Sequence, residues 1–550
     1  MGDILRDQAR AWLDQDPDPR TREELRRLLD EGDDAALADR FGARLEFGTA
    51  GLRGALGAGP NRMNRVTVMR AAAGVASWLG SRGTVVVGYD ARHRSADFAR
   101  DTAEVLTGAG CTVLMLPGPL PTPVLAHTVR ARGADAGIMV TASHNPPRDN
   151  GYKVYVGGSG PDAGSQIVPP ADTEISAAID AAGPVDRMPL GTDWEVLDGR
   201  AVDDYLGAIC ALPTGRHRDV EITYTPLHGV GARTLLQAFA WAGFPAPRVV
   251  MEQADPDPDF PTVEFPNPEE PGALDLALVT GRDHHSDLIL ANDPDADRLA
   301  VAVPGHGLLT GDEVGGLIAE HVLRSTTGGD RVVATTIVSA GLLPKIAADH
   351  GVRCAETLTG FKWLVRAAGP DERLVFAYEE AIGYCVGGDH GRPVADKDGI
   401  GAALAVAAIA AEAKREGRTL LDLLDDQARR FGLHTTGQVA VRVPGIEVMS
   451  ETMAGLRAEP PQDFGVFAVD AVEDFADGRD GLPPTDALRY RLRGPAEGRV
   501  ILRPSGTEPK LKAYIEVVTP VDDDITTIRA EARGHLTHLE EAVRRLFPAA

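Results

Sequence analysis

Cysteine is scarce in this sequence, and its spacing excludes the usual roles of paired cysteines. The 550 residues contain four cysteines, none of them in a CxxC pair: Cys111, Cys210, Cys354 and Cys385. Scattered thiols are typical of a reduced intracellular protein and argue against a disulfide framework or a zinc site. We therefore expect a cytoplasmic protein.

Long apolar runs and an apolar leader are also missing. The longest apolar run, residues 400–411, has 12 residues, whereas a helix that spans a bilayer needs about 20. The chain is charged from Asp3 onward, which predicts no signal peptide. We expect no membrane partner.

Basic residues are fewer than acidic residues, and few of the basic residues are lysines. The formal net charge of −25 argues against nucleic acid or an anionic membrane as the main partner. An anionic substrate would then need a local basic pocket. Only seven of the 56 basic residues are lysines, and five lie in candidate motifs: Lys153, Lys362, Lys397, Lys510 and Lys512. Lysine is suited to places that need a compact charge or a titratable amine, although biased composition could also explain the pattern.

The length and the hydrophobic pattern predict a multidomain α/β protein. A chain of 550 residues is too long for one core and suggests about three to five domains. Residues 4–40 are expected to form charged amphipathic helices. Predicted strands at 84–88, 111–116, 136–140, 221–225, 288–291, 331–335 and 374–377 alternate with helical stretches such as 96–107 and 232–243. This alternation favours mixed, largely parallel sheets.

The sequence changes character from Val439 onward. Alternating strands, an Asp/Gly-rich hairpin at 474–486 and a terminal helix at about 523–546 indicate a separate α+β domain. We predict boundaries near 205, 314 and 436. The predicted domains are therefore 1–204, 205–314, 315–436 and 437–550.

A serine at the end of a predicted strand is the first candidate functional group. The apolar run 136–140 is followed by Thr141-Ala142-Ser143-His144-Asn145-Pro146-Pro147, where polar residues and prolines end the strand in a loop. A serine there can be held rigidly with its hydroxyl facing a cleft, although a turn or cap would need the same residue. Because consecutive side chains rarely point at each other, we expect no serine-hydrolase dyad with His144.

An acidic loop is the second candidate. Asp293-Pro294-Asp295-Ala296-Asp297-Arg298 follows the apolar run 287–291, and three alternating carboxylates can converge on a hard cation. An EF-hand needs glycine and glutamate where this chain has Arg298 and Pro304, so we reject it. An acidic turn without metal would show the same pattern. The Pro-rich acidic stretch 255–270 follows no comparable strand, and we predict a long loop without metal.

Several other segments have the composition of ligand-binding loops. The Gly-rich run 46–54 contains Arg53, and Gly151 precedes Lys153. Arg503-Pro504-Ser505-Gly506-Thr507 combines a guanidinium, hydroxyls and backbone N–H groups that could cradle one anion. A carboxylate such as Glu379 can accept hydrogen bonds from two vicinal hydroxyls. No lysine is followed by serine or threonine, which disfavours a nucleotide kinase with a P-loop.

The order of these motifs, over roughly residues 44–516, resembles the α-D-phosphohexomutase superfamily of phosphoglucomutases and phosphomannomutases. The resemblance implies three related α/β domains and a C-terminal α+β domain around a central cleft. It implies an isomerase that moves a phosphoryl group between positions 1 and 6 of a hexose phosphate. It also implies a phosphoserine, Mg²⁺, and a sugar bisphosphate as activator and intermediate.

The resemblance also implies roles for individual residues. Ser143 would carry the phosphoryl group and bind the metal beside Asp293, Asp295 and Asp297. The catalytic residues that match the superfamily pattern, besides Ser143, are Arg53, His144, Lys153 and Arg298. The matching substrate-binding residues are Gly360, Lys362, Glu379, Lys397, Arg503, Ser505, Gly506 and Thr507.

One departure leaves the sugar open. Many members have serine where this chain has Ala381, which resembles the phosphoglucomutase-2/phosphopentomutase branch, so phosphopentomutase is a second possible activity. A Mg²⁺-dependent sugar phosphatase would use the same phosphoserine, and a non-catalytic sugar-phosphate sensor would need only the binding loops. We expect a small phosphosugar as the partner and a monomer or weak homodimer.

Overall fold

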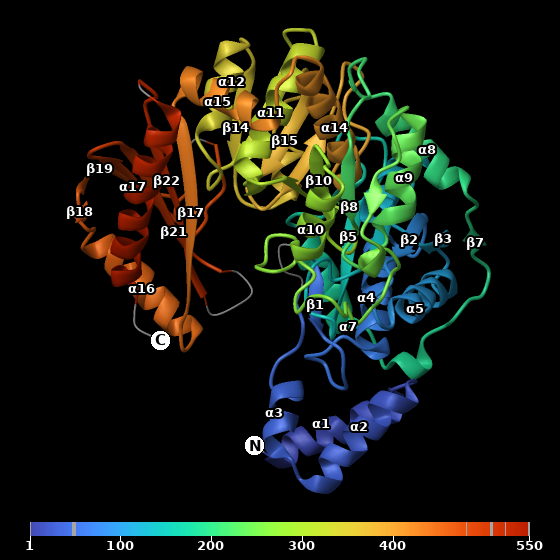
Figure 1. Cartoon of the computed structure of the whole chain (residues 1–550). Coiled ribbons are helices and arrows are strands. Elements are labelled where there is room, and N and C mark those ends of the chain that lie inside the picture. The colour runs from blue at the N-terminus through green and yellow to red at the C-terminus, as the bar shows by residue number, and fades with distance from the viewer. Residues whose placement is uncertain (1, 47–50, 480, 506–509, 523, 548–550) are drawn as a thin grey trace. The chain divides into compact units, whose positions relative to one another are not determined.

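The computed structural model describes residues 2–46, 51–479, 481–505, 510–522 and 524–547 (Figure 1). The chain divides into two compact units. Unit 1 comprises Met1–Leu309 and Gly383–Glu412, and unit 2 comprises Thr310–Ile382 and Ala413–Ala550. No helix among the described residues is long and apolar enough to cross a membrane.

Unit 1 begins with three short helices, drawn in blue in Figure 1: α1 (Gly2–Gln15), α2 (Pro19–Glu31) and α3 (Asp34–Phe41). The start of α2 is fixed by Asp18, whose carboxylate accepts the Arg20 N–H, and by a proline in the first turn. Trp12, Leu25 and Leu37 pack with Val66 and Met69 in one buried cluster. The predicted N-terminal helices are confirmed.

The first sheet of unit 1 has the strand order β1-β5-β4-β2-β3-β7. Its strands are β1 (Leu52–Ala55), β2 (Thr84–Tyr89), β3 (Thr112–Pro119), β4 (Ala136–Val140), β5 (Asp149–Val156), β6 (Ser165–Gln166, paired with β5) and β7 (Glu195–Val196). Its helices are α4 (Arg65–Trp78), α5 (Ser95–Gly108), α6 (Thr122–Ala131) and α7 (Ala171–Ala181). The pairs β2–β3, β2–β4 and β3–β7 are parallel, whereas β5 runs antiparallel to β4 and β1.

The second sheet of unit 1 has the order β12-β11-β10-β8-β9. Its strands are β8 (Ile222–Thr225), β9 (Arg248–Val249), β10 (Leu288–Asn292), β11 (Leu299–Val303) and β12 (Gly307–Leu308). The accompanying helices are α8 (Arg200–Cys210), α9 (Gly231–Trp241) and α10 (Asp275–Asp283). Strands β8 and β10 are parallel, and β10 turns back into β11 as an antiparallel hairpin. Residues 254–270 contain neither helix nor strand, as predicted.

Strand β16 (Gly383–Val386) and the first residues of helix α14 (Gly399–Arg415) belong to unit 1. In unit 2, β14 (Arg353–Thr357) and β15 (Arg373–Glu379) both pair in parallel with β13 (Arg331–Thr336). The helices of this region are α11 (Gly311–Ser325), α12 (Leu342–Asp349), α13 (Phe361–Leu364) and α15 (Leu420–Phe431).

The C-terminal part of unit 2 is built on a six-stranded sheet of order β17-β22-β21-β20-β19-β18. Its strands are β17 (Leu433–Arg442), β18 (Asp463–Phe464), β19 (Phe467–Asp474), β20 (Leu488–Arg493), β21 (Glu497–Pro504) and β22 (Lys510–Thr519), and its helices are α16 (Ile446–Ala458) and α17 (Ile525–Leu546). All its pairs are antiparallel. In Figure 1, α17 lies along β17 and β22. The predicted α+β domain and its terminal helix are confirmed.

All seven predicted strands exist, and α5 and α9 lie where the helical stretches were expected. Four α/β or α+β segments therefore follow one another, as the fold class requires. The antiparallel strands β1, β5 and β11 were not predicted. They matter for the site, because β5 carries Lys153 and the turn between β10 and β11 carries the acidic loop.

Candidate active site

Ser143 lies in a left-handed turn just beyond the end of β4, with a φ of 53°. This region is uncommon for residues other than glycine. Thr141 Oγ1 accepts the Ser143 N–H at 2.8 Å, and this contact stabilises the turn. Only 1% of Ser143 is exposed, and its hydroxyl donates to Asp293 Oδ2 at 2.6 Å. The structure thus joins the candidate serine to the candidate acidic loop, 150 residues further along the chain.

The premise that the consecutive side chains of Ser143 and His144 would not face each other is wrong, whereas the expectation of no serine-hydrolase dyad stays a prediction. The hydroxyl of Ser143 lies 3.2 Å from Nδ1 of His144. The two side chains approach each other at the left-handed turn of Ser143. Burial, together with the positive charges of Arg298 and Arg53, lowers the pKa of His144 well below its ordinary value.

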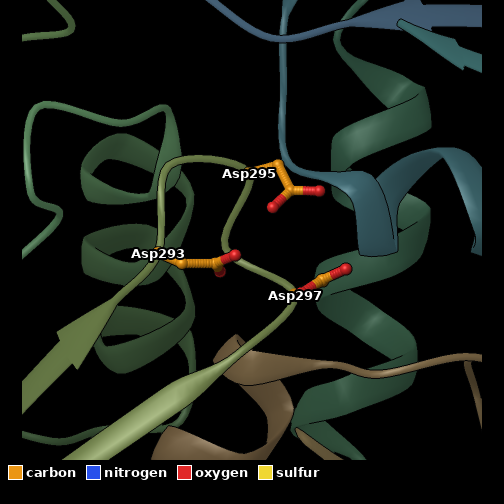
Figure 2. A group of neighbouring side chains, drawn as sticks. All are labelled: Asp293, Asp295 and Asp297. Atoms are coloured by element: carbon orange, nitrogen blue, oxygen red, sulfur yellow. The ribbon is translucent and has the colours of Figure 1, made fainter. Parts of the chain in front are cut away.

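The three aspartates of the acidic loop converge, as predicted. One carboxylate oxygen from each of Asp293, Asp295 and Asp297 lies within 4.8 Å of the others, and Figure 2 shows the three carboxyl groups around a common space. The loop is the turn of the β10–β11 hairpin. It is closed by the Asn292 side chain, which donates to the Arg298 carbonyl at 2.6 Å, and by the Arg298 N–H, which donates to Asp293 Oδ1 at 3.0 Å.

Two lysines offset part of the negative charge of this loop. The Lys153 ammonium donates to Asp295 Oδ2 at 2.8 Å and to Asp297 Oδ2 at 2.9 Å. Lys397 Nζ lies 3.4 Å from Asp297 Oδ2. Lys153 stands opposite Met139 in the β4–β5 ladder, so β5 carries it beside the strand that leads to Ser143. Burial alone would raise the pKa of Asp295, but the charge and hydrogen bond of Lys153 outweigh it and hold that pKa below the ordinary value.

The acidic loop has oxygen atoms available to bind a cation. Among the described residues, Oδ1 of Asp295 and Oδ1 of Asp297 are buried and have no hydrogen-bond partner, an arrangement that costs free energy unless a ligand satisfies them. Burial and the two neighbouring carboxylates raise the pKa of Asp293 well above its ordinary value. A hard divalent cation bound here would relieve both conditions, and an all-oxygen donor set suits such an ion. The residues therefore fit a metal site.

Arg53 and Arg298 are two further basic side chains of this region. Arg53 lies on β1 opposite Gly151 of β5, and its buried Nε has no hydrogen-bond partner in the part of the chain that the structure describes. Burial lowers the pKa of Arg53, while Asp295 and Asp297 counteract part of this effect. Arg298 Nε lies 3.8 Å from Asp297 Oδ1. The structure thus brings together all five residues predicted to be catalytic.

Lys397 was predicted to bind substrate, and the structure places it beside the acidic loop. The flanking carboxylates fix its backbone. Asp396 Oδ2 accepts from the Tyr155 hydroxyl and from the Gln166 amide, both at 2.9 Å. Asp398 Oδ1 accepts from the Tyr205 hydroxyl at 2.7 Å.

The other predicted substrate-binding residues belong to unit 2. Arg503 donates to the Thr359 hydroxyl at 2.6 Å, which joins two of the predicted loops. Gly360 has a φ of 107°, which requires glycine, and it precedes the buried Lys362 of α13. Glu379 ends β15. The Ser505 N–H donates to the Lys510 carbonyl at 2.8 Å, whereas Gly506 and Thr507 lie outside the described residues.

Three further side chains were not singled out from the sequence: Thr122 of unit 1, and Glu380 and Tyr514 of unit 2. Thr122 donates its hydroxyl to Asp295 Oδ2 at 2.6 Å. Glu380 accepts from the Thr336 and Ser339 hydroxyls, both at 3.3 Å. Tyr514 has a raised pKa because of burial and the charge of Glu380. Only Glu380 adjoins a predicted residue, so proximity in sequence could have found it.

Four domain families match successive parts of the chain. They are described as phosphoglucomutase/phosphomannomutase alpha/beta/alpha domain I (residues 44–185), domain II (203–307), domain III (310–431) and the C-terminal domain (468–533). These matches cover every segment in which candidate residues occur.

Curated relatives are similar over nearly the whole chain. A "Probable phosphomannomutase" of Haemophilus influenzae is 41% identical over 487 residues, which cover 87% of this chain and 97% of that protein. A phosphopentomutase of Homo sapiens is 34% identical over 589 residues, with 96% and 94% covered. A crystal structure of a phosphoglucomutase/phosphomannomutase family protein from Burkholderia thailandensis has a TM-score of 0.68 at 21% identity, covering 90% of this chain and 96% of that one. This last likeness concerns the fold.

Proposed function

The chain belongs to the phosphoglucomutase/phosphomannomutase family, and on this premise we propose that it is a phosphosugar mutase that uses Ser143 as its phosphoryl carrier. The reaction moves a phosphoryl group between positions 1 and 6 of a hexose phosphate. The observation that carries the proposal is the 2.6 Å hydrogen bond between Ser143 Oγ and Asp293. It puts a hydroxyl nucleophile at the edge of a buried carboxylate triad.

Each half-reaction is a phosphoryl transfer. The bond between Ser143 Oγ and phosphorus breaks, and a bond forms between phosphorus and the free hydroxyl of the sugar monophosphate. That hydroxyl loses its proton to a base, Ser143 Oγ takes up a proton as it leaves, and a sugar bisphosphate results. The Ser143 hydroxyl then loses its proton as it attacks the opposite phosphoryl group, and the sugar oxygen that is released takes up a proton.

The residues around Ser143 supply positioning and charge stabilisation, which are the main requirements of phosphoryl transfer. Arg53, Arg298 and the lysines can share the negative charge of the transferring group. His144 Nδ1, 3.2 Å from Ser143 Oγ, lies within hydrogen-bond reach of that oxygen and can exchange a proton with it. Mg²⁺ held by Asp293, Asp295 and Asp297 would act as a Lewis acid on the phosphoryl oxygens.

We propose that unit 2 recognises the sugar and the phosphate that is not reacting. Glu379 would accept hydrogen bonds from sugar hydroxyls, and Gly360 and Lys362 would lie along the ligand. Arg503, with Ser505, Gly506 and Thr507, would bind the second phosphate. The hydrogen bond from Arg503 to Thr359 supports a common binding region for these loops.

Phosphopentomutase activity is the second candidate, because Ala381 replaces a serine found in many family members. The relatives' names divide in the same way between hexose and pentose phosphates. We also propose domain boundaries near 205, 314 and 436, a cytoplasmic location and a monomer or weak homodimer. A sugar bisphosphate would serve as activator.

The test is phosphorylation of Ser143 together with turnover. After incubation with glucose 1,6-bisphosphate and Mg²⁺, intact-mass analysis should show one added phosphate on the wild type and none on Ser143→Ala. A coupled assay with glucose 1-phosphate, mannose 1-phosphate and ribose 1-phosphate should show turnover by the wild type alone. Mutase activity in Ser143→Ala would refute the proposal. Release of inorganic phosphate without mutase activity would indicate a phosphatase.

A further inference from the structure

One buried arginine donates hydrogen bonds to the backbone of the loop that carries Ser143, the phosphoserine candidate. Arg92 follows β2, and only 4% of it is exposed. Its Nη2 donates to the carbonyl of Ser143 at 2.6 Å and also to that of Asn145. Its Nη1 donates to the carbonyls of Pro146 and Asp149 at 2.9 and 3.2 Å. One guanidinium therefore satisfies carbonyls at both ends of the loop.

These carbonyls need a donor, because buried backbone groups without a partner are costly. The turn at Ser143 is left-handed, so local backbone preference does not favour it. The planar fork of arginine can bind several carbonyls at fixed angles, which a lysine ammonium cannot reproduce. Arg92 is thus positioned to hold the direction of the Ser143 backbone and, through it, the hydroxyl.

The long acidic loop 255–270 covers the other side of this guanidinium. The Phe260 ring lies beneath Arg92, with the guanidinium carbon 5.0 Å from its centroid, and only 2% of Phe260 is exposed. Such a contact is strongest where water is excluded. Phe260 itself has a φ of 47°, a conformation uncommon for an aromatic residue. Next to it, Asp259 Oδ1 lies 2.7 Å from His93 Nε2.

The segment that carries Arg92 is fixed independently of Phe260. Asp90 Oδ1 accepts from the Arg92 N–H at 3.0 Å and from the Ser95 hydroxyl at 2.6 Å. The Asn150 side chain donates to the carbonyl of His93 at 2.8 Å. The backbone around Arg92 is therefore anchored, and Phe260 acts on the end of its side chain.

We propose that Arg92, covered by Phe260 of the 255–270 loop, is a positioning residue that orients Ser143 for phosphoryl transfer. The proposal rests on the mutase function proposed for this chain and gives a role to a loop that had none. Arg92 acts through the backbone of residues 143–149, so it is expected to control the rate of transfer and to leave binding of the sugar phosphate unchanged.

Unit 1 contains its own matched control. Arg218 donates to the carbonyls of Ala242, Thr214 and His217, and its guanidinium carbon lies 4.5 Å from the centroid of the Phe244 ring. This second arginine has the same combination of carbonyl acceptors and aromatic cover, but none of these partners is a candidate catalytic residue. Arg218→Lys and Phe244→Leu therefore show how far stability and activity fall when an arginine loses its carbonyl acceptors or its aromatic contact away from the candidate site.

The experiment compares Arg92→Lys and Phe260→Leu with these two controls. For Arg92→Lys we expect kcat and the rate of Ser143 phosphorylation by glucose 1,6-bisphosphate to fall about 10- to 100-fold, because small misplacements of reacting groups have effects of this size. KM should stay within about twofold. Phe260→Leu should show a smaller fall, and both controls should retain the wild-type kcat.

Hydrogen–deuterium exchange provides a readout that does not require catalysis. Peptides covering residues 141–149 should exchange faster in Arg92→Lys and in Phe260→Leu, whereas peptides covering residues 293–298 should not change. If Arg92→Lys does not fold, the kcat and the exchange rate of Phe260→Leu decide whether Arg92 orients Ser143. Wild-type kcat and unchanged exchange at 141–149 in the folded variants would overturn the proposal. A wild type that never acquires phosphate would refute the mutase mechanism instead, and the exchange result would still test the role of Arg92.

Discussion

Thr122 and Asp295 form two hydrogen bonds with each other, although they lie 173 residues apart. The Thr122 hydroxyl donates to Asp295 Oδ2 at 2.6 Å, and its backbone N–H donates to the Asp295 carbonyl at 2.9 Å. Because Lys153 occupies the same Oδ2, the other carboxylate oxygen of Asp295 is left for a cation. Thr122 therefore orients a candidate metal ligand.

The first prediction follows from this contact. Thr122→Val removes the hydroxyl while keeping the shape, and should weaken Mg²⁺ binding about 10- to 100-fold, the usual effect of losing an outer-shell partner. Thr122→Ser should remain near the wild type. Calorimetric titration of the metal-free proteins with Mg²⁺ measures the affinity of both variants. Asp295→Asn shows how far the affinity falls when a metal ligand itself is changed.

Thr128 supplies the control for this experiment. It is buried on the same helix, and its hydroxyl donates to the Val124 carbonyl at 2.7 Å. Thr128→Val should leave Mg²⁺ affinity unchanged. Equal affinities for Thr122→Val and the wild type would show that Lys153 alone orients Asp295.

The second prediction concerns a buried carboxylate in unit 2. Glu516 Oε2 lies 2.8 Å from Arg499 Nη2. Glu516 Oε1 accepts from the Gly341 N–H and lies near His434 Nδ1, both at 2.7 Å. Burial alone would raise the pKa of Glu516, but these partners lower it to about 2. A depressed pKa in the folded state adds stability above the pKa of the unfolded state, which is lost as pH falls through the folded value.

Glu516→Gln should therefore reduce the free energy of unfolding by about 3 kcal/mol at pH 7. At pH 3 the difference in unfolding free energy between Glu516→Gln and the wild type should be less than half of its value at pH 7, because the carboxyl of the unfolded protein is then already protonated. Urea denaturation at the two pH values measures this. Glu372→Gln, which removes a partner of Arg353 from an exposed pair, should have little effect at either pH. A Glu516→Gln effect that does not depend on pH would mean that the carboxylate charge contributes nothing.

The main features of the fold could be predicted from the sequence because they depend on local patterns. Apolar runs bounded by glycine, proline and polar residues predicted β2, β4 and β13. The alternating aspartates after an apolar strand predicted where the acidic loop would lie. Such signals depend on residues adjacent in sequence, and single-chain patterns report them well.

The details of the site depend on distant partners and on backbone conformations that a side chain does not reveal. A left-handed serine carries no sequence signal, so the approach of Ser143 to His144 could not be predicted. The position of Lys153 requires β5 to run antiparallel to β4, and its charge is balanced by Asp295, 142 residues away. Arg92 and Thr122 act through contacts of the same long range.

The third prediction concerns the choice of sugar. Ala381 follows Glu379 and Glu380 and offers one hydroxyl fewer than serine, so we expect hexose and pentose phosphates to be accepted. Ala381→Ser should shift kcat/KM toward one hexose 1-phosphate relative to ribose 1-phosphate. Competition assays with mixed substrates measure the ratio directly. A strong preference for one hexose in the wild type, unchanged in Ala381→Ser, would contradict the prediction.

The last prediction is that Arg503 binds the phosphate that is not reacting. Its side chain is held by Thr359, and its fork can make charge-assisted hydrogen bonds to an anion. In the proposed mechanism the bisphosphate would present each of its ends to this arginine in turn, so both directions of the reaction would depend on it. Arg503→Ala should lower kcat/KM for the 1-phosphate and for the 6-phosphate alike, by about one to two powers of ten. Phosphorylation of Ser143 should still occur, because the Ser143 hydroxyl contacts Asp293 and the acidic loop keeps its own basic partners, Lys153 and Lys397. Arg493→Ala is the control, since Arg493 is exposed and pairs with Asp470 at 2.9 Å, and its kinetics should match the wild type. Normal kinetics in both directions for Arg503→Ala would show that residues 503–507 form an ordinary turn and that another group binds the second phosphate.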